Sequence, residues 1–240
     1  MHDELVRTQE GHVTRLTLNR PQKANALSAT LVEALLDAVE SAYSDGTRLL
    51  ILDGAGRHFC AGFDFTDYQN SSDGDLALRF IRIETLLQAL YHAPCETLVL
   101  AHGKIFGAGA DLVASCGTRI AATDTTFRMP GLNFGVVLGT RRLTHRIGAD
   151  RAREILSASR TFGAEEAHRI GFLTGIAAQS AWPQVVEETR VRCERLSCGA
   201  AAALHRQTTI DTRAEDMAAL AESVSTPGLK ERIRLYREHS

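Results

Sequence analysis

Short apolar segments alternate with amphipathic segments along the first half of the chain. Residues 13–18 alternate apolar and polar side chains, which is typical of a half-buried strand. The apolar runs 49–52 and 97–101 are typical of strands that are buried on both faces. Between and after them, apolar residues recur every three or four positions and predict helices: 28–42, 75–91 and 107–116. This alternation favours a parallel α/β architecture.

The last hundred residues are richer in helical patterns than in strand patterns. Four further helices are expected: 151–157, 164–170, 183 to about 207, and 228–239. The polar loop 69–74 precedes the helix over 75–91 and is expected to be mobile. The chain therefore begins as α/β and ends as helices.

Composition and charge narrow the class of protein. The chain has 240 residues, of which 44% are hydrophobic, so it can form one globular domain with a sizeable core. Its net charge of -2 gives no long-range attraction for nucleic acid or anionic membranes. It lacks an apolar run of transmembrane length and a signal-like N-terminus, so a cytoplasmic protein with neither kind of partner is expected.

Cysteine and histidine spacing gives no indication of a metal site. Five cysteines and nine histidines are dispersed, without C-x-x-C, H-E-x-x-H or H-x-H groupings. The cysteines are expected to be small buried thiols. We therefore predict no bound metal.

Small residues gather at two junctions where a strand leads into a helix or loop. These are His58–Asp64 and Gly107–Asp111. Small side chains let a ligand approach the backbone, and amides in a first helical turn have no intrahelical acceptor. Two facing turns of this kind could bind one carbonyl oxygen, and each donor is worth about 3–4 kcal/mol in acyl-transfer enzymes. Taken alone, glycine at such a junction more often reflects tight packing.

Taken together with other segments, these junctions resemble the crotonase (enoyl-CoA hydratase/isomerase) superfamily. The order and spacing agree over nearly the whole chain. The matching segments are Leu18–Ser28, Phe59–Asp64, Gly103–Leu112 and Phe127–Val136, followed by 139–143, 152–156 and 164–173. The resemblance implies an α/β fold, a spiral of ββα turns followed by helices that trimerise.

The resemblance also implies domains, partners and site residues. It implies a core with the active site over 1–180, and a helical region over 181–240 for oligomerisation and active-site cover, in a homotrimer or homohexamer. No tightly bound cofactor is implied, since coenzyme A is part of the thioester substrate. The thioester carbonyl would accept hydrogen bonds from the N–H groups of Ala61 and Ala108. The implied neighbours of CoA are Lys23, Ala24, Ala26, Ala61, Phe63 and Asp64, of which Lys23 is as readily a solvated surface lysine.

The sequence departs from the family at the acid/base positions. Family hydratases use two carboxylates, and here Asp111 stands at the first position, where glutamate is usual, and Gly131 at the second. Asp111 is the best acid/base candidate, although it could simply satisfy helix-terminal amides. One base opposite an oxyanion hole supports double-bond migration better than hydration. Thioester hydrolysis, decarboxylation and a non-catalytic acyl-CoA-binding protein remain alternatives.

Other polar residues near these motifs have weaker interpretations. Arg128 could bind a substrate carboxylate but is more readily a surface arginine. Tyr68 could reach the pocket, and His58 and His102 are interpreted as structural. A dinucleotide-binding site fits poorly, because Leu112 stands where a third glycine is required. The acyl group, its chain length and the pathway are left open.

Overall fold

The computed structural model describes residues 3–239, which form a mixed α/β fold. Its strands are β1 (Leu5–Glu10), β2 (Val13–Leu18), β3 (Leu49–Gly54), β4 (Glu96–Ala101), β5 (Lys104–Phe106), β6 (Thr118–Ala121), β7 (Thr126–Arg128), β8 (Phe162–Gly163) and β9 (Gly175–Ile176). Its α-helices are α1 (Ala29–Ser41), α2 (Asp73–Tyr91), α3 (Ala108–Ser115), α4 (Thr140–Ile147), α5 (Ala149–Ala158), α6 (Ala164–Arg169), α7 (Trp182–Glu194), α8 (Cys198–Thr208), α9 (Arg213–Ser225) and α10 (Leu229–Glu238).

The strands form two sheets. The larger has the order β1-β2-β3-β4-β6-β9, in which β1 pairs antiparallel with β2 and the other pairs are parallel. The smaller has the order β5-β7-β8. The expected parallel α/β arrangement is therefore confirmed, with one antiparallel edge strand in each sheet, β1 and β8. Because β5 leads through Gly107 into α3, the smaller sheet determines the position of the first turn of α3.

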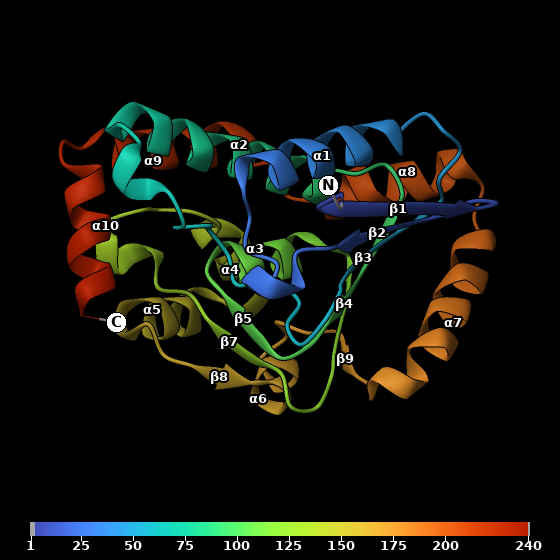
Figure 1. The fold of residues 1–240 in the computed structure, drawn as a ribbon. Coiled ribbons are helices and arrows are strands. Elements are labelled where there is room, and N and C mark those ends of the chain that lie inside the picture. The colour runs from blue at the N-terminus through green and yellow to red at the C-terminus, as the bar shows by residue number, and fades with distance from the viewer. Residues whose placement is uncertain (1–2, 240) are drawn as a thin grey trace.

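Helices cover both faces of the larger sheet (Figure 1). On β3, Leu50 and Leu52 belong to the main core beneath α1 and α2, whereas Leu49 and Ile51 pack toward α7. This alternation is the two-residue period of a strand. Burial on both faces explains why the sequence shows an unbroken apolar run here, as predicted.

The C-terminal region differs from the expected pattern. A single helix was expected from 183 to about 207, but α7 ends at Glu194 and α8 begins at Cys198. Ser197 separates them, because its Oγ accepts the Ala200 N–H and caps α8. Strand β1 and helices α4 and α9 were not predicted; β1 is largely exposed, so it lacks the apolar alternation that marks β2.

The five cysteines differ in how exposed their side chains are. Cys60, Cys95 and Cys116 are buried, as expected, whereas Cys193 is half-buried and Cys198 is exposed. The expectation of buried thiols is therefore wrong for Cys198, which is the first residue of α8. Across residues 3–239, no cluster of three or more His, Cys, Asp or Glu is arranged to hold a metal ion, and no helix is long and apolar enough to cross a membrane.

The carboxylate of Asp73 holds the start of the last helix, α10, against α2. Asp73, the first residue of α2, accepts the backbone N–H groups of Gly228, Leu229 and Lys230 at 3.0, 3.1 and 2.8 Å. These are the unpaired donors at the start of α10, so Asp73 caps that helix from another element. The same hydrogen bonds, above all that from Lys230, lower the pKa of Asp73. The segment 69–74, expected from the sequence to be a loop, therefore includes the first residue of α2, which anchors α10.

Replacing Asp73 by alanine is expected to loosen α10. We expect the free energy of unfolding to fall by about 1–2 kcal/mol at neutral pH, with faster amide exchange in 229–238. Because the folded-state pKa is lowered, this contribution is present above the unfolded pKa and is lost as pH falls through the folded pKa. Denaturant unfolding and hydrogen exchange measure both effects. Asp150→Ala, at an exposed carboxylate in the first turn of α5, is the control; an equal effect there would contradict the capping role.

Candidate active site

A cavity of about 850 Å³ lies between the start of α3, the segment after Gly62, and the last helix. Most of the residues predicted to form the site line it: Lys23, Ala26, Ala61, Phe63, Asp64, Ala108 and Asp111. Ala24 does not. Tyr68, Arg128 and Gly131 also line the cavity, whereas His58 and His102 do not. The structure therefore brings the two small-residue junctions to one place.

The two junctions meet backbone to backbone at Gly62. A Cβ atom on Gly62 would lie 2.4 Å from the Phe106 carbonyl oxygen and 3.2 Å from the Ala108 nitrogen, and its φ is +84°. Only glycine fits such an approach. Ala108 begins α3, so its N–H has no acceptor within the helix. Gly62 therefore brings the first junction against an amide at the start of α3.

The first junction offers a different amide from the one expected. The Ala61 N–H already donates to the Ala24 carbonyl oxygen at 2.9 Å. On either side of Phe63, the Gly62 carbonyl accepts the Leu27 N–H at 2.7 Å and the Asp64 N–H donates to the Leu27 carbonyl at 3.3 Å. Within residues 3–239, the Phe63 N–H has no such partner. This pattern argues against Ala61 as the first donor, because its hydrogen is already engaged.

Asp111 is a buried carboxyl group at the edge of the cavity. It lies in the first turn of α3 and is only 3% exposed. Its Oδ1 has no hydrogen-bond partner in the described chain, so the group does not cap helix-terminal amides. Burial raises the pKa of Asp111 well above its ordinary value, while Arg142 opposes and Glu84 adds to this shift. This shift favours the protonated, neutral form of the Asp111 carboxyl group.

The Asp111 carboxyl lies directly against Gly139. A Cβ atom on Gly139 would lie 1.8 Å from Asp111 Oδ1, and the φ of Gly139 is +65°. A side chain at 139 would therefore collide with the carboxyl group, in a backbone conformation that side chains disfavour. Gly139 immediately precedes α4, so this contact also fixes the start of α4 against α3.

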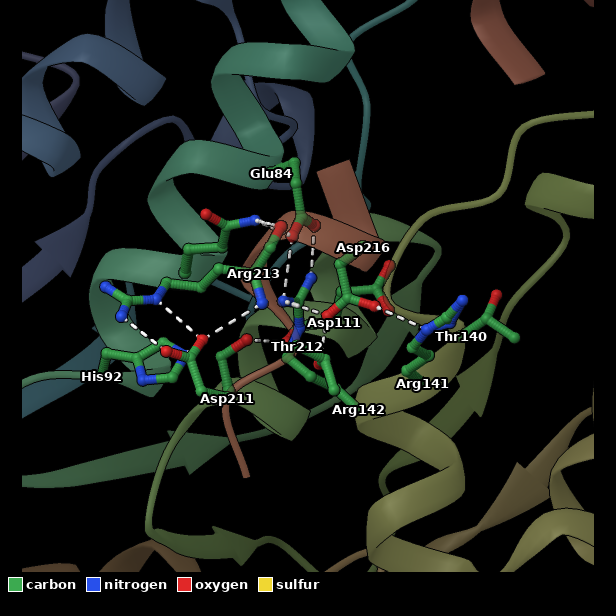
Figure 2. A network of polar contacts seen from close by, with 12 residues as sticks. Glu84, His92, Asp111, Thr140, Arg141, Arg142, Asp211, Thr212, Arg213 and Asp216 are labelled. Atoms are coloured by element: carbon green, nitrogen blue, oxygen red, sulfur yellow. Dashed lines mark hydrogen bonds and ion pairs between the residues drawn. The ribbon is translucent and has the colours of Figure 1, made fainter. Parts of the chain in front are cut away.

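Behind Asp111 lies a buried network of charges (Figure 2). Arg142 on α4 and Glu84 on α2 are 2% and 1% exposed, and Nη1 of Arg142 donates to Glu84 Oε1 at 3.0 Å. Arg142 Nη2 bonds the second Glu84 oxygen, so the pair is bidentate. Asp216 on α9 approaches Arg142 Nη1 at 3.4 Å. Sequence analysis missed this network, although Glu84 falls on the apolar face of α2, next to Ile83.

Asp64 and Lys23 have unequal roles at the cavity mouth. Burial raises the pKa of Asp64, but hydrogen bonds from Thr66 and Arg20 outweigh burial and lower it. Its Oδ1 accepts the Thr66 N–H at 2.9 Å, and Arg20 pairs with Oδ2 at 2.9 Å. Asp64 therefore fixes its own loop. Lys23 is exposed, and its Nζ lies 3.5 Å from Thr66 Oγ1.

The structure also gives contacts or burial for the four polar residues with weaker sequence-based interpretations. Arg128 Nε donates to the Ser159 carbonyl at 3.1 Å, and Tyr68 is buried. His58 Nδ1 accepts the Lys104 N–H at 3.1 Å, and His102 Nε2 lies 3.0 Å from the Gly56 carbonyl oxygen. Both histidines therefore hold loops together, as interpreted from the sequence.

Aromatic side chains form one wall of the cavity. Phe63 and Phe80 stack with ring centroids 4.3 Å apart, and Phe134 packs against Tyr236 of α10 at 5.1 Å. Tyr236 and Arg237 both line the cavity, so the last helix forms part of its wall. This wall suits an apolar group.

An α/β spiral that ends in helices, with a buried acid beside unengaged backbone amides, defines a crotonase-type enzyme. The sequence profile of the family described as enoyl-CoA hydratase/isomerase matches residues 8–228. The chain therefore belongs to the enoyl-CoA hydratase/isomerase family of the crotonase superfamily.

Individual relatives agree with this assignment. A Bacillus subtilis (strain 168) protein named for enoyl-CoA hydratase is 31% identical over 185 residues, 74% of this chain and 70% of that protein. A Bordetella parapertussis crystal structure named for enoyl-CoA hydratase/isomerase is 49% identical, with a TM-score of 0.96 over 98% of each chain. The enoyl-CoA hydratase structure from Mycobacterium smegmatis is 27% identical, with a TM-score of 0.80 over 98% of this chain and 96% of that one. The predicted family and fold are confirmed.

Proposed function

We propose that the chain moves a double bond within an enoyl-CoA thioester, with Asp111 as the single acid/base. The observation that carries this proposal is one buried carboxyl group beside two unengaged backbone amides in a largely apolar cavity. Gly131, at the position of a second acid, has no side chain to hold a water. Asp64 also lines the cavity, but its carboxylate is already engaged by Arg20 and Thr66.

In the proposed reaction, the thioester oxygen accepts hydrogen bonds from the N–H groups of Phe63 and Ala108. Asp111, once its own proton has passed to water, removes a proton from Cα of a 3-enoyl thioester, and the electron pair of the broken C–H bond delocalises onto the thioester oxygen as a dienolate. Asp111 then returns the proton to Cγ, which leaves the 2-enoyl isomer. A raised pKa makes the carboxylate a stronger base, and brings the acid closer to the working pH. Each backbone donor is worth about 3–4 kcal/mol in related acyl chemistry.

The raised pKa of Asp111 also favours a second candidate, decarboxylation of a malonyl-type thioester. Loss of carbon dioxide leaves its bonding electron pair as an enolate, and a neutral Asp111 protonates Cα without first having to ionise. Hydration requires a water-activating group in addition, which Gly131 does not supply. Thioester hydrolysis has the same requirement.

The surroundings support further parts of the proposal. Lys23 and Ala26 line the cavity beside Asp64, which suits the pantetheine and nucleotide of CoA there. Exposed apolar side chains in the C-terminal region support self-association as a homotrimer or homohexamer: Val191, Leu196 and Leu204. We propose a cytoplasmic location, with residues 1–180 as the catalytic core and 181–240 as the oligomerisation and cover region.

The test is product analysis with a panel of CoA thioesters in deuterated water. The panel contains 2-enoyl, 3-enoyl, saturated acyl and malonyl-type esters, and mass spectrometry reads each product. We expect interconversion of 2-enoyl and 3-enoyl esters with deuterium at Cα or Cγ and no change in the number of oxygen atoms. Carbon dioxide release selects decarboxylation, and free CoA selects hydrolysis. Binding without turnover of any ester would replace the catalytic proposal with a binding protein.

A further inference from the structure

Two buried polar atoms near the cavity lack hydrogen-bond partners, and they are complementary. One is the acceptor Asp111 Oδ1 on α3, and the other is the donor Arg142 Nε on α4. Buried polar groups without partners are rare and each calls for an explanation. The two helices pack against one another at Gly139, whose backbone touches Asp111 three residues before Arg142. The donor and the acceptor thus belong to one electrostatic unit.

The remaining nitrogens of Arg142 are already engaged. Both Nη atoms bond Glu84, and Nη1 also approaches Asp216. Nε is the one guanidinium nitrogen of Arg142 that has no acceptor in the described residues. The bidentate pair fixes the plane of the guanidinium and therefore the direction of Nε–H. Glu84 thus determines the direction in which Arg142 offers its Nε–H.

The charge balance around Asp111 favours its protonated form. On the elements packed against α3, the facing groups are Glu84 on α2 and Arg142 on α4, with Asp216 of α9 behind Arg142. Arg146 of α4 instead bonds the carbonyls of Ala114 and Cys116 at the far end of α3. The guanidinium of Arg142 is therefore already paired with two other carboxylates, those of Glu84 and Asp216. The other charged groups of the cavity are Lys23, Asp64, Arg128 and Arg237.

We propose that Glu84 and Arg142 form a positioning pair that sets the protonation of Asp111, so that Arg142 Nε receives the Asp111 carboxylate only while the proton is on the substrate. This inference rests on the proposed acid/base role of Asp111. Glu84 neutralises Arg142 in the resting site and so favours the protonated form of Asp111. When Asp111 ionises, the unpartnered Nε–H is available to bind it. Neither Glu84 nor Arg142 lines the cavity, so both act through Asp111.

The test titrates Asp111 directly and does not depend on turnover. The C=O stretch of the protonated Asp111 carboxyl is followed by infrared difference spectroscopy against pH, and is assigned by its absence in Asp111→Asn. In Glu84→Gln the amide keeps the shape and one acceptor for Arg142, but the competing charge is gone. We expect the ionised fraction of Asp111 at a fixed pH to rise about tenfold, a change of about one pH unit in the midpoint. Any Asp111-dependent limb of a pH–rate profile should move equally.

Two further variants keep the test decisive. Glu33→Gln removes the same charge from an exposed pair with Arg82, and should leave the midpoint unchanged. Asp216→Asn removes the second carboxylate that contacts Arg142. It should move the midpoint of the Asp111 titration in the same direction as Glu84→Gln, but by a smaller amount. This variant replaces Glu84→Gln in the test if Glu84→Gln does not fold. A wild-type midpoint in folded Glu84→Gln, or in Asp216→Asn when Glu84→Gln does not fold, would overturn the proposal. If no thioester reacts but the midpoint shifts as expected, the pair is supported and the proposed reaction is rejected.

Discussion

Asp111→Asn is expected to lower kcat about 10²–10⁴-fold while leaving the affinity for the CoA thioester within a few-fold of wild type. Positioned acid/base groups contribute rate enhancements of this size. Asparagine keeps the volume of the side chain against Gly139, but it cannot exchange a proton with the substrate. The thioester oxygen would still meet the N–H groups of Phe63 and Ala108, so binding should persist. Steady-state kinetics and calorimetric titration with a non-reacting thioester measure the two quantities.

The pH dependence of stability shows whether Asp111→Asn loses activity because the acid/base group is gone or because the fold is disrupted. A raised folded-state pKa means that the contribution of the protonated Asp111 is fully present below the unfolded pKa and is lost as pH rises through the folded pKa. Asparagine has no such loss, so the variant should gain stability relative to wild type as pH rises. Asp37→Asn, at an exposed position of α1, should change neither property. Undiminished turnover in Asp111→Asn would remove Asp111 from the mechanism.

Gly62→Ala is expected to have the second largest effect, because it separates the two proposed donors. The new Cβ would lie 2.4 Å from the Phe106 carbonyl oxygen and 3.2 Å from the Ala108 nitrogen. One segment must move, and loss of one oxyanion donor lowers kcat about 10²–10³-fold. The φ of +84° adds about 1–2 kcal/mol of backbone strain. Kinetics and denaturant unfolding measure the two effects.

Gly199→Ala provides the matched control for this substitution. Gly199 lies in α8, has no positive φ, and a Cβ atom added to it would have no described atom within 4 Å. Alanine there should raise stability by about 0.5–1 kcal/mol without changing turnover. If Gly62→Ala behaves like Gly199→Ala, the close approach of the two segments has no part in catalysis.

Elements with a strong apolar pattern could be predicted from the sequence, and those without one could not. Strands β2, β3 and β4 and helices α1, α2 and α3 have one or two buried faces, which leave a period in the sequence. The exposed strand β1 leaves no such period. The break between α7 and α8 depends on one capping residue, Ser197, and a helical pattern continues across it.

The site could be predicted as a set of segments but not atom by atom. The order of small-residue motifs located the cavity and Asp111. It could not distinguish Ala61 from Phe63 as a donor, because that choice depends on a hydrogen bond to Ala24, 37 positions earlier in the sequence. The network of Glu84, Arg142 and Asp216 joins three helices distant in the chain, and only the fold shows that one guanidinium serves both carboxylates.

The cap that Asp73 provides for α10 joins residues that are synthesised far apart in time. Asp73 emerges early from the ribosome, but its three N–H partners begin at Gly228, 155 residues later. Until that stretch is released, Tyr236 cannot cover Phe134, and the aromatic wall of the cavity stays open to water. A nascent chain thus exposes an apolar surface that can attract other incomplete chains. The cavity can therefore enclose a ligand only after residues 228–238 have been synthesised and α10 has packed in place.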